Sequence, residues 1–238
     1  MHSCFHPSLQ IGVQSLSEDE AVHVSRVLRM KAGDTVRLIN GMGSSAVGQL
    51  LEVGKRKASV SVESLDIHEA ERPKGLMLVV APTKSNDRFE WLLEKATELG
   101  VESICPVWTS RSERRIDKHE RWEKVLVAAT KQSQRLWKPS LQKAVELSVF
   151  LGHAEALGRG HGAVAHCISE MQGLPERVDW KQWQIDKGQA WLAIGPEGDF
   201  TPDEVGQMIA VGAQPVHLGE HRLRTETAGM AAVAQFVA

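Results

Sequence analysis

The sequence predicts a two-domain α/β protein, in which a small β-rich domain precedes a larger domain built on a mostly parallel sheet. Three strand-like runs follow one another between residues 35 and 65, and from residue 76 onward apolar runs alternate with amphipathic helical segments. Such alternation is typical of a parallel sheet with helices on both faces. The chain has 238 residues, enough for two domains that each bury a core. We therefore place the domains at residues 1–72 and 73–238.

The first domain is expected to begin with a single helix. Ser17 and Glu20 have the S-x-x-E spacing of a capping box, and apolar residues at helical spacing extend the predicted helix to Gly33. A turn is expected at residues 40–43 and a linker at 71–73. Strands are predicted over residues 35–39, 46–53 and 58–65.

The second domain is predicted to alternate strands with helices along its length. Gly100 is expected to end the first helix, and Thr201 with Glu204 to cap a later one. The predicted strands cover residues 76–81, 103–108, 163–168, 189–194 and 215–218. The predicted helices cover 89–99, 117 to before Pro139, a segment from about 148, a segment from 201, and 228–237.

Composition argues against several classes of protein. Hydrophobic residues make up 42% of the chain, and no stretch approaches the eighteen apolar residues that a membrane span needs. The first six residues lack the basic and apolar regions of a secretion signal. Cys4, Cys105 and Cys167 are odd in number and widely spaced, which indicates reduced thiols. We expect a cytoplasmic protein that does not engage a membrane.

Charge is distributed unevenly, although the net charge is only −2. Residues 111–143 carry ten Lys or Arg against four acidic residues, whereas residues 144–238 carry six against twelve. A basic central segment beside an acidic end suits a protein that places one face on nucleic acid. Charge alone equally allows a solvated helix face.

Several common catalytic motifs are absent from the sequence. It has no G-x-x-x-x-G-K-[ST] and no G-x-G-x-x-G after a strand, so nucleoside triphosphates and dinucleotides are not expected. It has no G-x-S-x-G and, despite ten histidines, no H-E-x-x-H. We therefore expect no metal. Four histidines are interpreted as ordinary surface or loop residues: His161, His166, His217 and His221.

Two glycine-bearing turns carry the strongest functional signal. Residues 195–200 read GPEGDF, residues 218–228 read LGEHRLRTETA, and each turn follows a strand-like run. Glycines at the carboxyl ends of parallel strands let backbone groups approach a small molecule closely, and open α/β sheets bind ligands at that edge. The pair of turns therefore predicts a ligand pocket.

These turns, with EKATELGV at 94–101 and KQSQR at 131–135, resemble the SPOUT class of methyltransferases and, more closely, its RsmE-type family. That family methylates N3 of a uridine in 16S ribosomal RNA. The resemblance implies a PUA-like barrel as the first domain, a deep trefoil knot in the second and S-adenosyl-L-methionine as cofactor. It also implies the assembled small ribosomal subunit as substrate, and a homodimer whose active sites the partner subunit completes. Asp199 and Glu220-His221 depart from the family pattern beside the pocket.

The resemblance and the chemistry of this cofactor together give a candidate binding set. Apolar side chains would hold the adenine ring, and the close backbone at the glycines would approach its polar edge. The candidates are Leu192, Ile194, Gly195, Pro196, Glu197, Gly198, Leu218, Gly219, Leu223 and Thr225.

Methylation at N3 of uracil requires loss of a weakly acidic proton and stabilisation of the anion that remains. Arg224 is the candidate for the stabilising charge, and Glu226 or an activated water is the candidate base. The alternative is that Arg224 and Glu226 pair with each other and hold the loop. Thr225 or Thr227 is expected to cap the final helix.

Candidate RNA-binding residues come from both domains. Arg26 and Arg29 lie three apart, in an element similar to the family's VLR motif, and are expected to share a helix face that meets phosphates. The other candidates lie after the first strand of the second domain, in the basic segment, or in an element similar to the family's Gln-Ser-x-Arg motif. They are Lys84, Arg88, Arg111, Arg114, Arg115, Gln134 and Arg135.

The tryptophans are interpreted by position. Trp122 and Trp137 lie in the basic segment, where base stacking is the hypothesis. Trp91, Trp108 and Trp191 are expected to be buried.

Two alternative functions stay open. One is a methyltransferase of the same fold that acts on a ribose 2′-hydroxyl or another base, which the mass of nucleosides from digested RNA would distinguish. The other is a non-catalytic RNA-binding assembly factor, for which a disrupted pocket would be the sign, whereas Gly195, Gly219 and Arg224 are all present.

Overall fold

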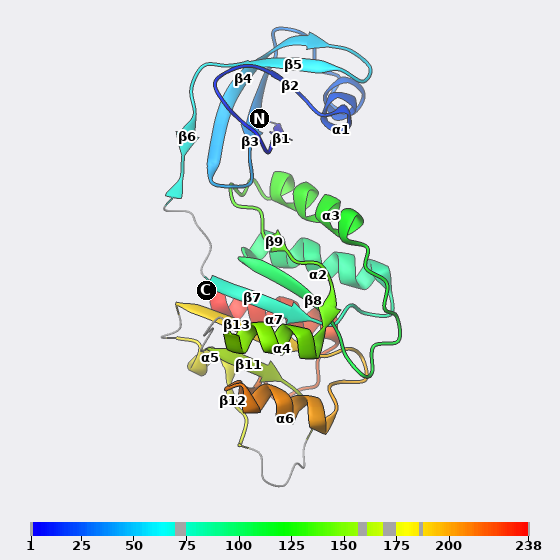
Figure 1. Cartoon of the computed structure of the whole chain (residues 1–238). Coiled ribbons are helices and arrows are strands. Elements are labelled where there is room, and N and C mark those ends of the chain that lie inside the picture. Colours follow the sequence, from blue (N-terminus) through cyan, green and yellow to red (C-terminus); the bar gives the residue numbers. More distant parts are fainter. Residues whose placement is uncertain (1, 70–74, 157–160, 169–174, 186–187, 238) are drawn as a thin grey trace. The chain divides into compact units, whose positions relative to one another are not determined.

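The computed structural model describes residues 2–69, 75–156, 161–168, 175–185 and 188–237 (Figure 1). The chain divides into two compact units. The first comprises Met1–Arg72 with Val127–Lys138, and the second Pro73–Leu126 with Pro139–Ala238. The linker expected at 71–73 falls outside the described residues.

The first unit contains a six-stranded sheet in the order β1-β3-β4-β5-β2, with β6 beside β4. All of its pairs are antiparallel except β1 with β3. The three predicted strands are confirmed as β3, β4 and β5, while β1, β2 and β6 went unpredicted because two to four residues carry too little periodicity. The bounds are β1 Ser3–Phe5, β2 Gly12–Ser15, β3 Thr35–Ile39, β4 Ser44–Val53, β5 Ala58–Val62 and β6 Asp66–Ile67.

The helix of the first unit is shorter than predicted. Helix α1 spans Glu18–Val22, and a π-helical turn, His23–Val27, follows it, so the expected extension to Gly33 is wrong. Ser17 does cap the helix, since its hydroxyl accepts from the Glu20 amide at 3.3 Å. The other half of the capping box is missing because the Glu20 carboxylate accepts instead from the Phe5 amide at 3.1 Å and from Lys131.

A partly buried ion pair joins Glu20 to Lys131, which lies in helix α3, His119–Gln132. The Lys131 Nζ lies 2.6 and 2.8 Å from the two carboxylate oxygens, and the side chains of Lys131 and Glu20 are 17% and 7% exposed. Burial and the neighbouring Glu20 carboxylate raise the pKa of the Cys4 thiol to about 12. Removing either Glu20 or Lys131 would leave the remaining member of the ion pair charged and desolvated.

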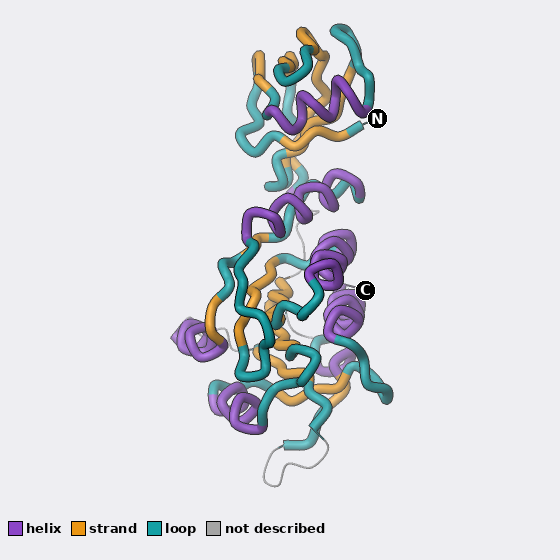
Figure 2. Tube along the Cα trace, turned by 90° about the vertical axis from the view of Figure 1, so that its right-hand side faces the viewer, coloured by secondary structure: helices purple, strands orange, loops and turns teal. Residues whose placement is uncertain are grey.

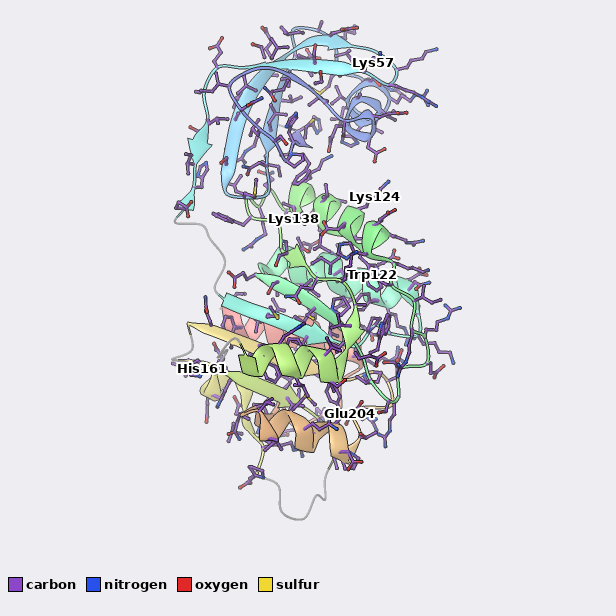
Figure 3. The ribbon with its side chains drawn as sticks, in the orientation of Figure 1. Lys57, Trp122, Lys124, Lys138, His161 and Glu204 are labelled. Carbon is purple, nitrogen blue, oxygen red and sulfur yellow. The ribbon has the colours of Figure 1, made fainter. Side chains whose placement is uncertain are left out.

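We expect Lys131→Met to lower the free energy of unfolding by about 3 kcal/mol, because Glu20 would keep a buried charge without its partner. Adding Glu20→Gln should recover part of that loss. Lys57→Met, at an exposed lysine of the same unit (Figure 3), is the control and should change stability by less than about 0.5 kcal/mol. Urea denaturation measures all three; a Lys131→Met protein as stable as the control would contradict this role of the pair.

The second unit is built on an eight-stranded sheet in the order β10-β8-β7-β13-β11-β14-β12, with β9 beside β8. Every pair is parallel, which confirms the predicted sheet type. Strand β11 lies between β13 and β14, which follow it in sequence. The bounds are β7 Gly75–Val80, β8 Ser103–Trp108, β9 Ser140–Leu141, β10 Val145–Glu146, β11 Gly162–Ala165, β12 Val178–Asp179, β13 Gln189–Ile194 and β14 Gln214–His217.

Helices cover both faces of this sheet, as predicted (Figure 2). One face buries side chains of α2, α5, α7 and the start of α3, and the other buries those of α4 and α6. Gly100 ends α2 with φ +99°, and Thr201 with Glu204 forms the complete capping box of α6. The bounds are α2 Asn86–Leu99, α4 Leu147–Ala156, α5 Trp180–Trp183, α6 Pro202–Ala210 and α7 Thr225–Val237. In the described part of the chain, no helix is long and apolar enough to cross a membrane.

The burial of two tryptophans, Trp122 and Trp91, differs from what the sequence predicted. Trp122 is 2% exposed and packs edge-to-face on Phe89 at 4.9 Å, so it belongs to the core and cannot stack on bases. Trp91 is 40% exposed, not buried. Trp108 and Trp191 are buried as predicted. Trp137 is half-buried, and its indole donates to the His68 carbonyl at 3.1 Å.

Candidate active site

A cavity of about 900 Å³ lies at the carboxyl ends of β11, β13 and β14. Both glycine-bearing turns line it, together with the residues that follow β11. This is the edge at which parallel α/β sheets bind ligands, and the volume suits a small organic molecule. Eight of the ten predicted cofactor residues line it: Ile194, Gly195, Pro196, Glu197, Leu218, Gly219, Leu223 and Thr225.

Leu192 and Gly198 do not line the cavity. Leu192 is fully buried in the core, two residues further down β13 than Ile194, which places it roughly 7 Å from the strand end. Gly198 is exposed and lies against the alkyl chain of Arg111. The hydrophobic pattern of a strand indicates burial and does not indicate depth along the strand.

The first turn, residues 195–200, folds tightly on itself. A Cβ at Gly195 would meet the Phe200 amide nitrogen at 3.0 Å and the Asp199 carbonyl carbon at 3.1 Å. Asp199 has φ +63°, the left-handed conformation that favours glycine. Its carboxylate accepts from the Cys167 and Phe200 amides, both at 2.8 Å, so this departure from the family pattern ties the turn to the segment after β11.

The second turn, residues 218–224, is joined to the first at its far end. Gly219 has φ +131°, and the Thr225 hydroxyl donates to the Gly195 carbonyl at 2.9 Å. Thr225 is the first residue of α7, and its hydroxyl is used in this link, so it does not cap the helix as expected. The two turns therefore form one wall.

A second wall was not predicted. His166 is 8% exposed and Cys167 is exposed at the cavity rim; both follow β11. Arg177 donates to the His166 carbonyl at 2.7 Å. Burial, and then the nearby Arg177, lower the pKa of His166. His166 lies in a loop, as one of its two predicted interpretations had it, but it is not a surface residue. Its buried Nδ1 has no hydrogen-bond partner in the described part of the protein.

The candidate catalytic residues do not pair with each other. Arg224 is exposed and lines the cavity, with no ion pair to another described side chain. Glu226 is 8% exposed and is not among the lining residues; its Oε1 lies 3.8 Å from Nε of Arg88. The alternative of an Arg224–Glu226 pair is therefore wrong, and Arg88 holds Glu226 instead.

Of the other RNA candidates of the second unit, Lys84 and Arg111 contact the first turn. Lys84 pairs with Glu113 at 2.6 Å, and its backbone amide donates to Glu197 at 3.0 Å. Arg115 pairs with Glu146 at 2.7 Å. Arg111 donates to carbonyls of the turn, whereas Arg114 is simply exposed.

The RNA candidates of the first unit are mostly exposed, but not on one helix. Arg26 is exposed on the π-helical turn, whereas Arg29 lies beyond it with φ +54°, so the expected shared helix face is wrong. Gln134 is also exposed and left-handed, with φ +58°, and Arg135 is half-buried.

The fold and this cavity define an α/β protein with a ligand-sized cavity lined by two glycine-bearing turns at the carboxyl edge of its parallel sheet. Residues 70–237 match the model of a family described as RNA methyltransferase domain, and residues 16–63 match the RNA methyltransferase PUA domain. The ribosomal RNA small subunit methyltransferase E of Rickettsia conorii is 30% identical over 92% of this chain and 87% of its own. The chain therefore belongs to this RNA methyltransferase family, as the sequence motifs predicted.

Solved structures agree in fold over nearly the whole chain. A probable rRNA-methyltransferase from Porphyromonas gingivalis is 32% identical, with a TM-score of 0.86 over 98% of this chain and 95% of its own. The ribosomal RNA small subunit methyltransferase E of Neisseria gonorrhoeae, solved with bound S-adenosyl methionine, is 27% identical, with a TM-score of 0.82 over the same shares. The parallel sheet and the β-rich unit are thus shared with methyltransferases.

Proposed function

We propose that this protein transfers a methyl group from S-adenosyl-L-methionine to N3 of a specific uridine in 16S ribosomal RNA, acting on the assembled small subunit. The cavity between the turns at 195–200 and 218–224 is the observation that carries this proposal. The Neisseria gonorrhoeae relative supports the choice of cofactor, and the name it shares with the Rickettsia conorii relative supports the choice of RNA.

The residues present fit this cofactor. Ile194, Leu218 and Leu223 give an apolar slot for adenine, and Gly195 and Gly219 keep the backbone close to it. The buried, unpartnered Nδ1 of His166 is a polar atom that a ligand's hydroxyl or amine would satisfy. No cluster that could hold a metal ion occurs among the described residues.

In the proposed reaction, bound S-adenosyl-L-methionine supplies an electrophilic methyl group. Arg224, exposed at the cavity, would place its guanidinium beside the uracil carbonyls and favour the anion formed when N3 loses its proton. Because Glu226 is outside the lining, a water molecule is better placed than this carboxylate to take the proton.

We further infer the finer architecture and setting that the family implies. Residues 1–72 would form a PUA-like barrel for RNA docking and residues 73–238 a knotted SPOUT domain, with the matches at 16–63 and 70–237 in support. The protein would be a cytoplasmic homodimer whose partner subunit completes each active site. Insertion of β11 between β13 and β14 brings the loops that follow these three strands to one cavity, which supports this proposal.

Nucleoside mass spectrometry of 16S RNA tests the reaction. Cells that lack the protein should lose one N3-methyluridine, and restoring the gene should return it. Loss of a ribose-methylated or other base-methylated nucleoside would favour a different target of the same fold. An unchanged nucleoside profile would favour a non-catalytic RNA-binding factor.

Docking through the first unit predicts a salt-dependent effect. Arg26 and Arg29 are exposed cations, so Arg26→Ala with Arg29→Ala should weaken binding to the small subunit and lower the slope of log K against log salt by about two. Cofactor affinity should stay unchanged. A double variant at the exposed Lys55 and Lys57 removes the same charge from the same unit and is the control. Equal effects of the two double variants would show that net charge, not this surface, drives docking.

A further inference from the structure

Arg111 lies in the basic segment, yet its guanidinium forms hydrogen bonds to the first glycine-bearing turn. Its Nη1 donates to the Gly198 carbonyl at 2.7 Å and to the Phe200 carbonyl at 3.2 Å. Its alkyl chain lies along Gly198, where a Cβ on that glycine would sit 3.4 Å from the Arg111 Cβ and Cδ. One cation thus contacts the turn on the outside, while residues 195–197 and Asp199 line the cavity on the inside.

The segment that carries Arg111 is itself held in place. The Ser110 amide donates to Oε1 of Glu204 at 2.7 Å, while Oε2 of the same carboxylate accepts from the Thr201 amide at 2.8 Å. Glu204, labelled in Figure 3, is 7% exposed at the start of α6. The Thr109 amide donates to the Ser112 hydroxyl at 3.0 Å and closes the segment on itself. Arg111 therefore projects from a fixed base and not from a free loop.

The turn needs external contacts because its own conformation is costly. Asp199 is left-handed, a conformation that costs a residue with a side chain about 1 kcal/mol or more. Inside the turn, one backbone bond closes it, from the Asp199 amide to the Pro196 carbonyl at 2.9 Å. The Asp199 carboxylate also accepts from the Phe200 amide within the turn. Hydrogen bonds to other segments join Glu197 to the Lys84 amide, Asp199 to the Cys167 amide, the Gly195 carbonyl to the Thr225 hydroxyl, and two further carbonyls to Arg111. Among these contacts, only that of Arg111 has a positively charged donor, and this donor binds backbone carbonyls of the turn.

We propose that Arg111 is a positioning residue of the cofactor site, which fixes the 195–200 turn in its binding conformation and does not contact RNA. This inference rests on the proposed function, since it assumes that the cavity binds S-adenosyl-L-methionine. It removes Arg111 from the predicted RNA surface. A turn that is already ordered loses less conformational freedom when ligand binds, so Arg111 should act on affinity for the cofactor.

The matched comparison is between Arg111→Ala and Arg114→Ala, two exposed arginines of one segment with equal charge loss. We expect Arg111→Ala to weaken S-adenosyl-L-methionine binding in calorimetry about tenfold, as loss of a charged hydrogen bond does. Methylation at saturating cofactor and the affinity for small subunits should stay within about twofold of the unmodified protein. Arg114→Ala should leave cofactor affinity unchanged. Arg111→Lys retains one donor and should recover part of the affinity.

Hydrogen exchange without cofactor gives a readout independent of activity. The amides of residues 197–200 should exchange faster in Arg111→Ala than in Arg114→Ala, because one side of the turn would be released. Unchanged cofactor affinity and exchange in Arg111→Ala would overturn the inference, as would a loss of RNA affinity with cofactor affinity intact. If Arg111→Ala does not fold, the same readouts on Arg111→Lys decide. Failure of the unmodified protein to bind S-adenosyl-L-methionine would instead overturn the proposed function.

Discussion

Gly219→Val should abolish measurable binding of S-adenosyl-L-methionine while the protein stays folded. Gly219 has φ +131°, a conformation that a β-branched residue adopts only at a cost of about 1–3 kcal/mol. A Cβ there would contact nothing within 4 Å, so the substitution acts through the backbone and not through a clash. The second turn would therefore shift, and with it the lining that it contributes. Calorimetry should show a loss of affinity of at least about a hundredfold.

The control for this substitution is Gly212→Val. Gly212 has φ +89°, and a Cβ there would also contact nothing within 4 Å, but Gly212 precedes β14, whereas Gly219 follows it. Both variants carry comparable backbone strain, so their losses of thermal stability should be similar. Only Gly219→Val should lose the cofactor. If Gly212→Val loses it equally, general destabilisation explains both, and if Gly219→Val binds normally, the pocket assignment is wrong.

Local pattern was sufficient to predict the long elements and the identity of the turns. Strand β13 is continuously apolar after its first residue, helix α2 has apolar residues at helical spacing over fourteen residues, and Gly100 ends α2 where a left-handed residue is needed. The Thr201 capping box also depends only on neighbours in sequence. Each of these features depends on residues that are close together in the sequence, and such local structure can be predicted from a single sequence.

The second wall of the cavity depends on strand order, which no local pattern contains. His166 reaches the site because β11 lies between β13 and β14, and Arg177 reaches it because it precedes β12, which pairs with β14. Such an arrangement is decided by contacts between residues far apart in sequence. The same reason explains Glu20, whose carboxylate does not bind the Ser17 amide as a capping box requires but binds Lys131, 111 residues away. A contact over that sequence distance is not contained in a local capping pattern.

The contacts of the arginines within the protein could not be predicted from residue type. Arg88, Arg111 and Arg115 are predicted RNA contacts, and in the structure each also contacts a group of the protein: Glu226, the first turn and Glu146, respectively. A guanidinium binds a carboxylate or a carbonyl as readily as a phosphate. The sequence could not tell these acceptors apart, whereas the contacts can.

Arg224→Ala should reduce the rate of methylation about a hundredfold or more and leave the binding of cofactor and small subunit nearly unchanged. Arg224 is exposed at the cavity, and its own guanidinium pairs with no described side chain, so it is available to a developing anion. Its backbone carbonyl accepts from the Ala228 amide at 2.8 Å, a bond that the substitution keeps. The start of α7 should therefore survive. Arg224→Lys should rescue part of the rate, since lysine offers a point charge without the planar fork.

Single-turnover assays at saturating cofactor and small subunit separate this effect from binding. Arg222→Ala is the control, because Arg222 is also exposed, lines the same cavity and lies two residues away. If the loss of one positive charge in the cavity is enough to explain the slower methylation, Arg224→Ala and Arg222→Ala should lower the methylation rate equally. If Arg224 stabilises the uracil anion, Arg224→Ala should be slower than Arg222→Ala by more than about tenfold. A near-normal rate for Arg224→Ala, or a defect that disappears at higher cofactor concentration, would make Arg224 a binding or structural residue of the second turn.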